Sequence, residues 1–136
     1  MRRLLVLTLI LSAALASVAP AKTKNAITPK NPKKGEVLAA GHGLTYKGRV
    51  TGPGHMYVYV SKSRKQGKDG ILKKFVDVIK AKRKGTRFTA KAERETFSSY
   101  YLNTPGTYYW QAHRIACVPG ADDCAAEGPT VKFKVR

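Results

Sequence analysis

Hydrophobic and polar residues alternate along several short stretches of this chain. Leu44, Tyr46 and Val50 recur at even spacing, and residues 56–60 read Met-Tyr-Val-Tyr-Val. A period of two places successive side chains on opposite faces of a strand, and aromatic and β-branched residues favour strands. We therefore predict a strand at each place, with residues 56, 58 and 60 facing the core and the tyrosines between them facing outward.

The outward pair, Tyr57 and Tyr59, has two interpretations. The two rings could form a ledge that binds a ligand, or they could pack against side chains of neighbouring strands. Cross-strand packing is the commoner role of aromatic residues on a sheet, and we prefer it.

Residues 71–84 fit both a helix and a strand. The apolar residues that would share one helical face, with the charged residues largely off it, are Ile71, Leu72, Phe75, Val76 and Ile79. However, residues 75–79 are rich in strand formers, and Lys84-Gly85 looks like a turn that leads to a return strand over 86–92. We predict a hairpin here, with the basic amphipathic helix as the alternative.

The predicted strands begin near residues 36, 44, 56, 75, 86, 107 and 129, and mostly Gly, Pro and Lys turns join them. Seven short strands with this spacing indicate an all-β domain, an antiparallel two-sheet sandwich. We place this single domain at residues 35–136. Residues 22–34 are basic and contain Pro29 and Pro32, so we predict a disordered lead-in there.

Residues 1–21 have the order of a secretory signal peptide. Two arginines come first, an apolar run follows over 4–11, and small residues then become frequent. Cleavage after Ala16 or Ala21 fits the rule for small residues, and we prefer Ala16. A retained anchor is the alternative, but the apolar run is short for the roughly 30 Å of a bilayer core. We therefore expect a secreted, extracellular protein that is not transmembrane after cleavage.

The two cysteines, Cys117 and Cys124, agree with export. Outside a reducing compartment such a pair is most simply a disulfide that closes one loop, worth at most roughly 2 to 3 kcal/mol. The alternative is a metal site with His113 and Asp122 or Asp123. Two thiols without a second close pair of ligands make a poor zinc signature, and we predict no metal.

Catalytic machinery is sparse in this sequence. The histidines are His42, His55 and His113, and there is no Gly-x-Ser-x-Gly motif and no phosphate-binding loop. Asp122 and Asp123 follow Pro-Gly, which is typical of solvated turn acids. We predict that the protein is not an enzyme, uses no cofactor and has no small-molecule substrate, and we expect a monomer.

The formal net charge is +18 and the pI is about 10.2, so the protein attracts polyanions whatever its fold. The cations concentrate in residues 62–94. The tentative polyanion-binding residues are Lys62, Arg64, Lys65, Lys73, Lys74, Lys82, Arg83, Lys84 and Arg87. The partner would be a cell-envelope polymer, an anionic lipid surface or extracellular nucleic acid. The alternative is that the charges serve solubility and keep sheet edges from pairing.

A resemblance to a known family appears around residues 102–112. The residues that carry it are Leu102, Pro105, Gly106, Thr107, Tyr108 and Trp110. They resemble the run into strand F of fibronectin type III domains and related immunoglobulin-like sandwiches, and Gly43–Val50 and Gly128–Val135 look like strands B and G of secreted bacterial members.

The resemblance implies a structural role for two aromatic residues. In this family a tyrosine hydroxyl bonds back to the backbone at the corner before strand F, which would assign that role to Tyr108, with Tyr109 as the alternative. Tyr108 and Trp110 would then face the core, while Gln111 and His113 face outward. The family further implies a binding or spacer module without catalytic machinery, with an accessory or adhesive role and no specified ligand.

Overall fold

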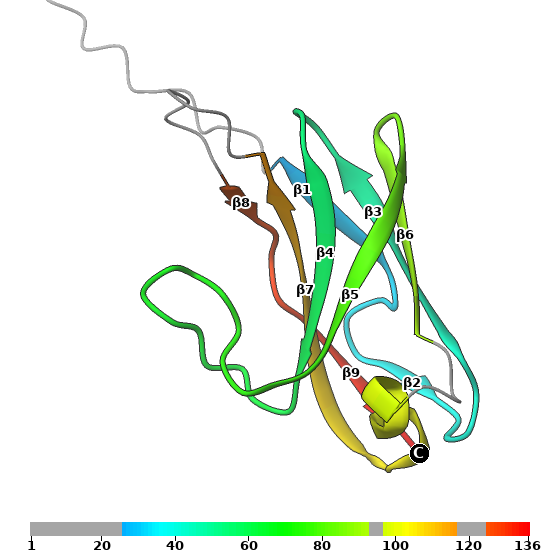
Figure 1. Cartoon of the computed structure of the whole chain (residues 1–136). Coiled ribbons are helices and arrows are strands. Elements are labelled where there is room, and N and C mark those ends of the chain that lie inside the picture. The colour runs from blue at the N-terminus through cyan, green and yellow to red at the C-terminus, as the bar shows by residue number, and fades with distance from the viewer. Residues whose placement is uncertain (1–25, 93–96, 117–124) are drawn as a thin grey trace, which may run out of the picture.

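The computed structural model describes residues 26–92, 97–116 and 125–136, which form nine strands and one 3₁₀ helix (Figure 1). In chain order these are β1 (Ile27–Asn31), β2 (Glu36–Leu38), β3 (Leu44–Val50), β4 (His55–Ser61), β5 (Phe75–Lys84), β6 (Arg87–Ala92), η1 (Phe97–Asn103), β7 (Gly106–Ile115), β8 (Ala125–Glu127) and β9 (Val131–Val135).

The strands form one curled, open sheet in the order β1-β3-β6-β5-β4-β7-β9-β2, with β8 paired to β7. The pairs are antiparallel except that of β2 with β9, which is parallel. The sheet curls until β1 contacts β7 across the core, which gives the domain a β-sandwich-like interior.

The predicted seven-stranded, two-sheet sandwich is therefore wrong. The strand that overturns it is β5, which pairs with β4 over Phe75–Ala81 and with β6 over Lys82–Lys84. At ten residues β5 is long enough to have different neighbours along its length, so it joins the two halves into one sheet.

The segment expected to be a disordered lead-in contains a strand. Residues 27–31 form β1 at the edge of the sheet, paired with β3, and Ile27 is buried. The prolines that argued against structure are tolerated at an edge, where one side of the strand has no ladder partner. The lone apolar Ile27 carried too little pattern to reveal the strand. The short strand β8 was not predicted either.

The hairpin interpretation of residues 71–92 is right. β5 and β6 pair antiparallel, and Gly85 at their turn has a φ of 59°, which suits glycine. The alternation on β4 is also as predicted, because Met56, Val58 and Val60 are fully buried while the two tyrosines between them lie on the outer face.

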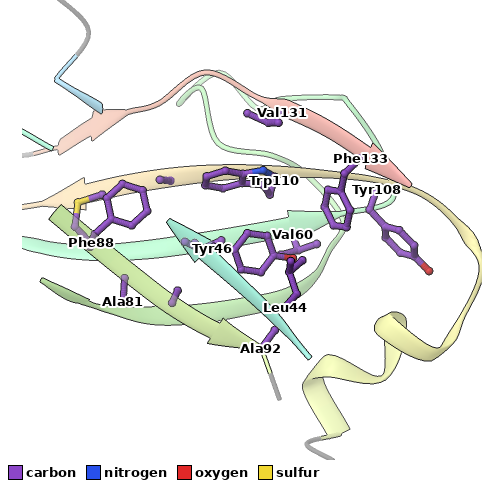
Figure 2. Close-up of a cluster of buried hydrophobic side chains, with 14 of the residues drawn as sticks. Leu44, Tyr46, Val60, Ala81, Phe88, Ala92, Tyr108, Trp110, Val131 and Phe133 are labelled. Atoms are coloured by element: carbon purple, nitrogen blue, oxygen red, sulfur yellow. The ribbon is translucent and has the colours of Figure 1, made fainter. Parts of the chain in front are cut away.

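Aromatic side chains fill the core inside the curl (Figure 2). The ring of Tyr46 lies 5.2 Å from that of Trp110, and Tyr108 stacks on Phe133 at 5.8 Å between centroids. Trp110 and Tyr108 are 0% and 1% exposed. The Trp110 indole N–H donates to the carbonyl of Pro32 at 3.2 Å, and the Tyr108 hydroxyl donates to that of Thr104 at 2.8 Å. These bonds give the buried polar atoms partners and tie β7 to distant segments.

Candidate functional site

The alternation that buries one side of β3 and β6 places cations on the other side. Tyr46, Gly48 and Val50 of β3 face the core, so Lys47 and Arg49 face outward. In the same way, the buried Phe88, Ala90 and Ala92 of β6 leave Arg87, Thr89 and Lys91 outside. The exposed positions of a strand thus form one polar stripe, and here the stripe is basic.

The register of the sheet arranges these cations in two cross-strand rows. Arg49 of β3 lies opposite Arg87 of β6, which in turn lies opposite Lys84 of β5. In the next row Lys47 and Lys82 flank Thr89 on its two sides. Because adjacent strands are about 4.8 Å apart, each row is a closely spaced series of positively charged or hydroxyl side chains.

We call this surface the cationic face. Its members are Lys30, Lys47, Arg49, Lys80, Lys82, Lys84, Arg87 and Lys91, all exposed. The acidic residues among the described part of the chain lie elsewhere: Glu36 on β2, Asp69 in the β4–β5 segment, Asp77 buried in β5 and Glu127 on β8. The face is therefore uniformly positive over its described residues. Like charges placed directly opposite each other on a sheet are destabilising, and an anion bound between them would relieve the repulsion.

Two shallow hollows lie on the cationic face. One, of about 170 Å³, is lined by Lys30, Lys47, Gly48, Arg49, Arg87, Phe88 and Thr89. The other, of about 220 Å³, is lined by Ile79, Lys80, Lys82, Thr89 and Lys91. The second lies where β5 and β6 diverge, since their pairing extends no further than Lys82 and Thr89. Thr89 lines both, so the hollows adjoin.

The predicted polyanion-binding residues do not all come together. Lys82, Lys84 and Arg87 belong to the cationic face. Arg83 lies on the opposite side of β5, where its guanidinium donates to the carbonyls of Gly85 at 2.9 Å and Gly54 at 3.2 Å. Arg83 therefore braces two turns. It lies apart from Lys82 and Lys84 because alternation along a strand sends neighbouring residues to opposite faces.

The remaining predicted cations lie in the segment between β4 and β5, which we call the basic loop (residues 62–74). Its cations are Lys62, Arg64, Lys65, Lys68, Lys73 and Lys74. Two backbone bonds of 2.8 Å, from Lys73 N–H to the Lys65 carbonyl and from Gly67 N–H to that of Ile71, give the loop a defined shape. The charges of the basic loop thus form a second basic region, apart from the cross-strand rows.

The basic loop is fastened to the outer face of β7 by Gln111. The Gln111 side-chain amide donates to the carbonyls of Gly70 at 2.9 Å and Gly128 at 3.0 Å, and its oxygen accepts from Leu72 N–H at 3.2 Å. Leu72 is 1% exposed beneath the loop. Gln111 was expected on the outward side, and it is there, but the loop covers it.

His113 is buried beside Gln111 and is not available to solvent. Its Nε2 lies 3.0 Å from the Gln111 side-chain oxygen, and its ring lies 4.8 Å from that of Tyr59. Burial lowers the pKa of His113 to about 4, against a smaller opposing effect of Asp69. The imidazole is therefore neutral near pH 7, and its role is to complete the hydrogen bonding of Gln111.

Five members of the cationic face were missing from the predicted set: Lys30, Lys47, Arg49, Lys80 and Lys91. The signal that identifies two of them is the alternation in residues 44–50. If Tyr46 and Val50 face inward, Lys47 and Arg49 must face outward. Their position beside the basic hairpin could not be inferred, because it depends on which strands pair.

Neither a metal-binding cluster nor a membrane-spanning helix is present among residues 26–92, 97–116 and 125–136. No group of three or more His, Cys, Asp and Glu side chains there is placed to hold a metal ion. No helix in the same part of the chain is long and apolar enough to cross a membrane. Cys117, Cys124 and the leader lie outside the described residues, so the disulfide and the signal peptide stay predictions.

Neither a family model nor a curated protein matches the chain. Among solved structures, an engineered protein matches 81% of this chain and 20% of its own, with a TM-score of 0.51 and 16% identity. A chain from a study of T cell specificity and activation by the bacterial superantigen toxic shock syndrome toxin-1 matches 81% of this chain and 98% of its own, with a TM-score of 0.50 and 12% identity. At these identities the likeness shows an all-β, β-sandwich-like fold alone.

Proposed function

We propose that this protein is a non-catalytic binding module that holds polyanions on its cationic face. The observation that carries the proposal is the row of three facing cations, Arg49, Arg87 and Lys84, on adjacent strands. A polymer of phosphate, sulfate or carboxylate groups would bridge such a row and release counterions, so its binding should weaken steeply with salt.

The position of the cations in the sheet favours binding over edge protection. Lysines that prevent sheets from pairing are expected on edge strands. The edges of the main strand order are β1 and β2, whereas the two cross-strand rows lie on the interior strands β3, β6 and β5. Protection of the edges therefore does not account for Arg49, Arg87 or Lys84.

The absence of catalysis is part of the proposal. Among the histidines, His113 is buried, bonded to Gln111 and held neutral by its lowered pKa. A general base needs access to substrate, which a fully covered imidazole lacks.

We also propose a distant relationship to fibronectin type III-like and immunoglobulin-like domains, with β7 in the role of strand F. It is supported by the bond from the Tyr108 hydroxyl to the Thr104 carbonyl, four residues upstream at the corner before β7. Export through the predicted leader and a Cys117–Cys124 disulfide complete the proposal. Intact-mass analysis of the secreted protein, with and without reduction, would test both.

Retention on heparin and DNA resins tests the binding function. The variant Arg49→Gln/Lys84→Gln/Arg87→Gln removes three charges from the cationic face, and Lys62→Gln/Arg64→Gln/Lys65→Gln removes three from the basic loop. We expect the first to elute at clearly lower salt than the second. Equal shifts would mean that net charge alone governs retention, and elution of the unmodified protein below about 0.2 M salt would contradict a dedicated binder.

A further inference from the structure

Two exposed apolar side chains lie together on the outer face of the sheet. Phe75 is 53% exposed and Val78 is 42% exposed. Both adjoin Tyr59: the rings of Tyr59 and Phe75 are 5.7 Å apart, and Val78 lies opposite Tyr59 in the β4–β5 ladder. We call Phe75 and Val78 the apolar patch. Adjacent exposed apolar side chains bordered by charge are typical of an interaction site.

The backbone around Phe75 is held in a shape that presents its ring. Lys74 has a φ of 51°, which is costly for a residue with a side chain. The β4–β5 register then shifts, so that Ser61 pairs with Phe75 while Val60 pairs with Asp77. The buried Ser61 hydroxyl stabilises this turn, since it lies 2.7 Å from the Lys73 carbonyl and 3.1 Å from that of Lys74. Strain and bulges of this kind often mark functional positions.

Cations border the apolar patch on two sides. On one side is the basic loop, whose exposed Lys73 and Lys74 directly precede Phe75. On the other is the cationic face, which begins at Lys80, opposite Tyr57. The acidic residues on the neighbouring elements are Asp69 in the basic loop and Glu127 of β8, which pairs with His113 of β7 on the other side of β4.

We infer that the apolar patch enters the headgroup region of an anionic lipid bilayer while the surrounding lysines bind the lipid phosphates. The inference rests on the proposed polyanion binding and names its ligand as anionic lipid. Aromatic and aliphatic side chains flanked by lysines are what an interfacial binding site requires. The position of the patch supports this arrangement, because β5 and β4 are the central strands of the sheet and their outer face lies opposite the buried core.

A single-stranded nucleic acid fits the apolar patch less well. Binding of that kind depends on ring faces on which bases stack. Val78 has no ring, and the ring of Tyr59 is already engaged in edge-type contacts with Phe75 and His113. The patch therefore offers one partly exposed ring, that of Phe75, beside an aliphatic side chain, which matches acyl chains better than stacked bases.

Co-sedimentation with phosphatidylglycerol vesicles tests the inference, with phosphatidylcholine vesicles as the uncharged comparison. We expect the protein to bind phosphatidylglycerol vesicles and not phosphatidylcholine vesicles. The variant Phe75→Ser/Val78→Ser should bind phosphatidylglycerol vesicles at least roughly tenfold more weakly than the unmodified protein. Tyr100→Ser is the matched control, because Tyr100 is 68% exposed on η1 and lies outside the patch. Equal affinity of the patch variant and the unmodified protein would overturn the inference. Far-UV circular dichroism verifies that each variant is folded.

Fluorescence gives a second readout that does not depend on affinity. The native Trp110 is 0% exposed, so Phe75→Trp adds a reporter at the surface. On vesicles that contain doxyl-labelled lipid, the added indole should be quenched, and the indole of a Tyr100→Trp variant should not. An unquenched reporter on bound vesicles would exclude insertion.

Heparin retention separates failure of this inference from failure of the proposed function. We expect Phe75→Ser/Val78→Ser to elute from heparin like the unmodified protein. If heparin retention persists but vesicle binding does not depend on the patch, the lipid inference alone fails. If the unmodified protein binds neither heparin nor vesicles, the proposed function fails. If the patch variant loses affinity for a single-stranded oligonucleotide but not for vesicles, nucleic acid replaces lipid and the inference is overturned.

Discussion

Arg49 of β3 lies directly opposite Arg87 of β6, and both side chains point away from the core. Folding therefore brings two positive charges together that are far apart in an extended chain. Lys84 extends the row on the next strand. Like charges that face each other across strands lower stability, so the row proposed to bind anions should affect the stability of the protein as well as its affinity.

We predict that Arg87→Thr stabilises the protein at low salt by about 0.5 kcal/mol, because it removes a like-charge pair and keeps a good strand former. The gain should shrink as salt screens the repulsion. Urea unfolding at low and high ionic strength measures the effect. Lys62→Thr in the basic loop is the control and should change stability little at either salt concentration. A gain for Arg87→Thr that does not depend on salt would contradict the electrostatic explanation.

Gly48 is required because Phe88 packs against its backbone. A Cβ atom at this position would lie 2.5 Å from the Phe88 ring and 2.6 Å from the Thr28 carbonyl oxygen. We predict that Gly48→Ala destabilises the protein by about 1 to 3 kcal/mol, as overpacking of a core does. Gly43→Ala is the control, since its Cβ would meet nothing closer than 3.4 Å. Comparable losses in urea unfolding for the two variants would show that the contact with Phe88 is unimportant.

Alternation of residue types identified β3 and β4, because each has one buried face. Residues 44–50 and 56–60 show the pattern clearly, and both are strands. The pattern failed for β1, where Ile27 is the single buried residue of a strand that also contains Pro29. A short edge strand has too few buried positions to produce a detectable period.

The arrangement of the strands could not be predicted, and the site depended on it. Nothing local in β5 indicates that its first part pairs with β4 and its last part with β6. Likewise, nothing local in the sequence indicates that Lys84 and Arg49, which are 35 positions apart, lie in one cross-strand row. Charge along the chain pointed to residues 62–94. The fold divides most of the described cations of that segment between the basic loop and the cationic face, leaves Arg83 on the opposite side of β5, and adds cations from β1 and β3.

His113 should make stability depend on pH in the acid range. Burial lowers its pKa to about 4, below the 6.5 expected for the unfolded chain. Between these values the unfolded state binds more protons than the native state, so the free energy of unfolding falls as pH decreases from 6.5 to about 4. Below that range His113 is protonated in both states and adds no further slope. Its neighbours are Asp69, Glu127, Tyr59 and Gln111.

The variant His113→Asn isolates the contribution of His113, because the carboxylates titrate in both proteins and their effect cancels in the difference between the two stabilities. We expect the stability difference between the unmodified protein and the variant to decrease as pH falls through the window, by at most about 1.4 kcal/mol per pH unit. Urea unfolding at intervals from neutral to acid pH measures it. A difference that is independent of pH would mean that His113 keeps an ordinary pKa in the folded protein.

Gln111 should hold the basic loop in place. Gln111→Leu keeps the size of the side chain but leaves the Leu72 N–H and the carbonyls of Gly70 and Gly128 without their partner. We predict a loss of about 2 to 3 kcal/mol and faster hydrogen exchange at Leu72, since buried polar groups without partners are costly. Gln66→Leu is the control, because that exposed amide makes one bond, to Thr130 at 3.0 Å. Unchanged exchange at Leu72 in Gln111→Leu would show that the buried leucine alone fastens the loop.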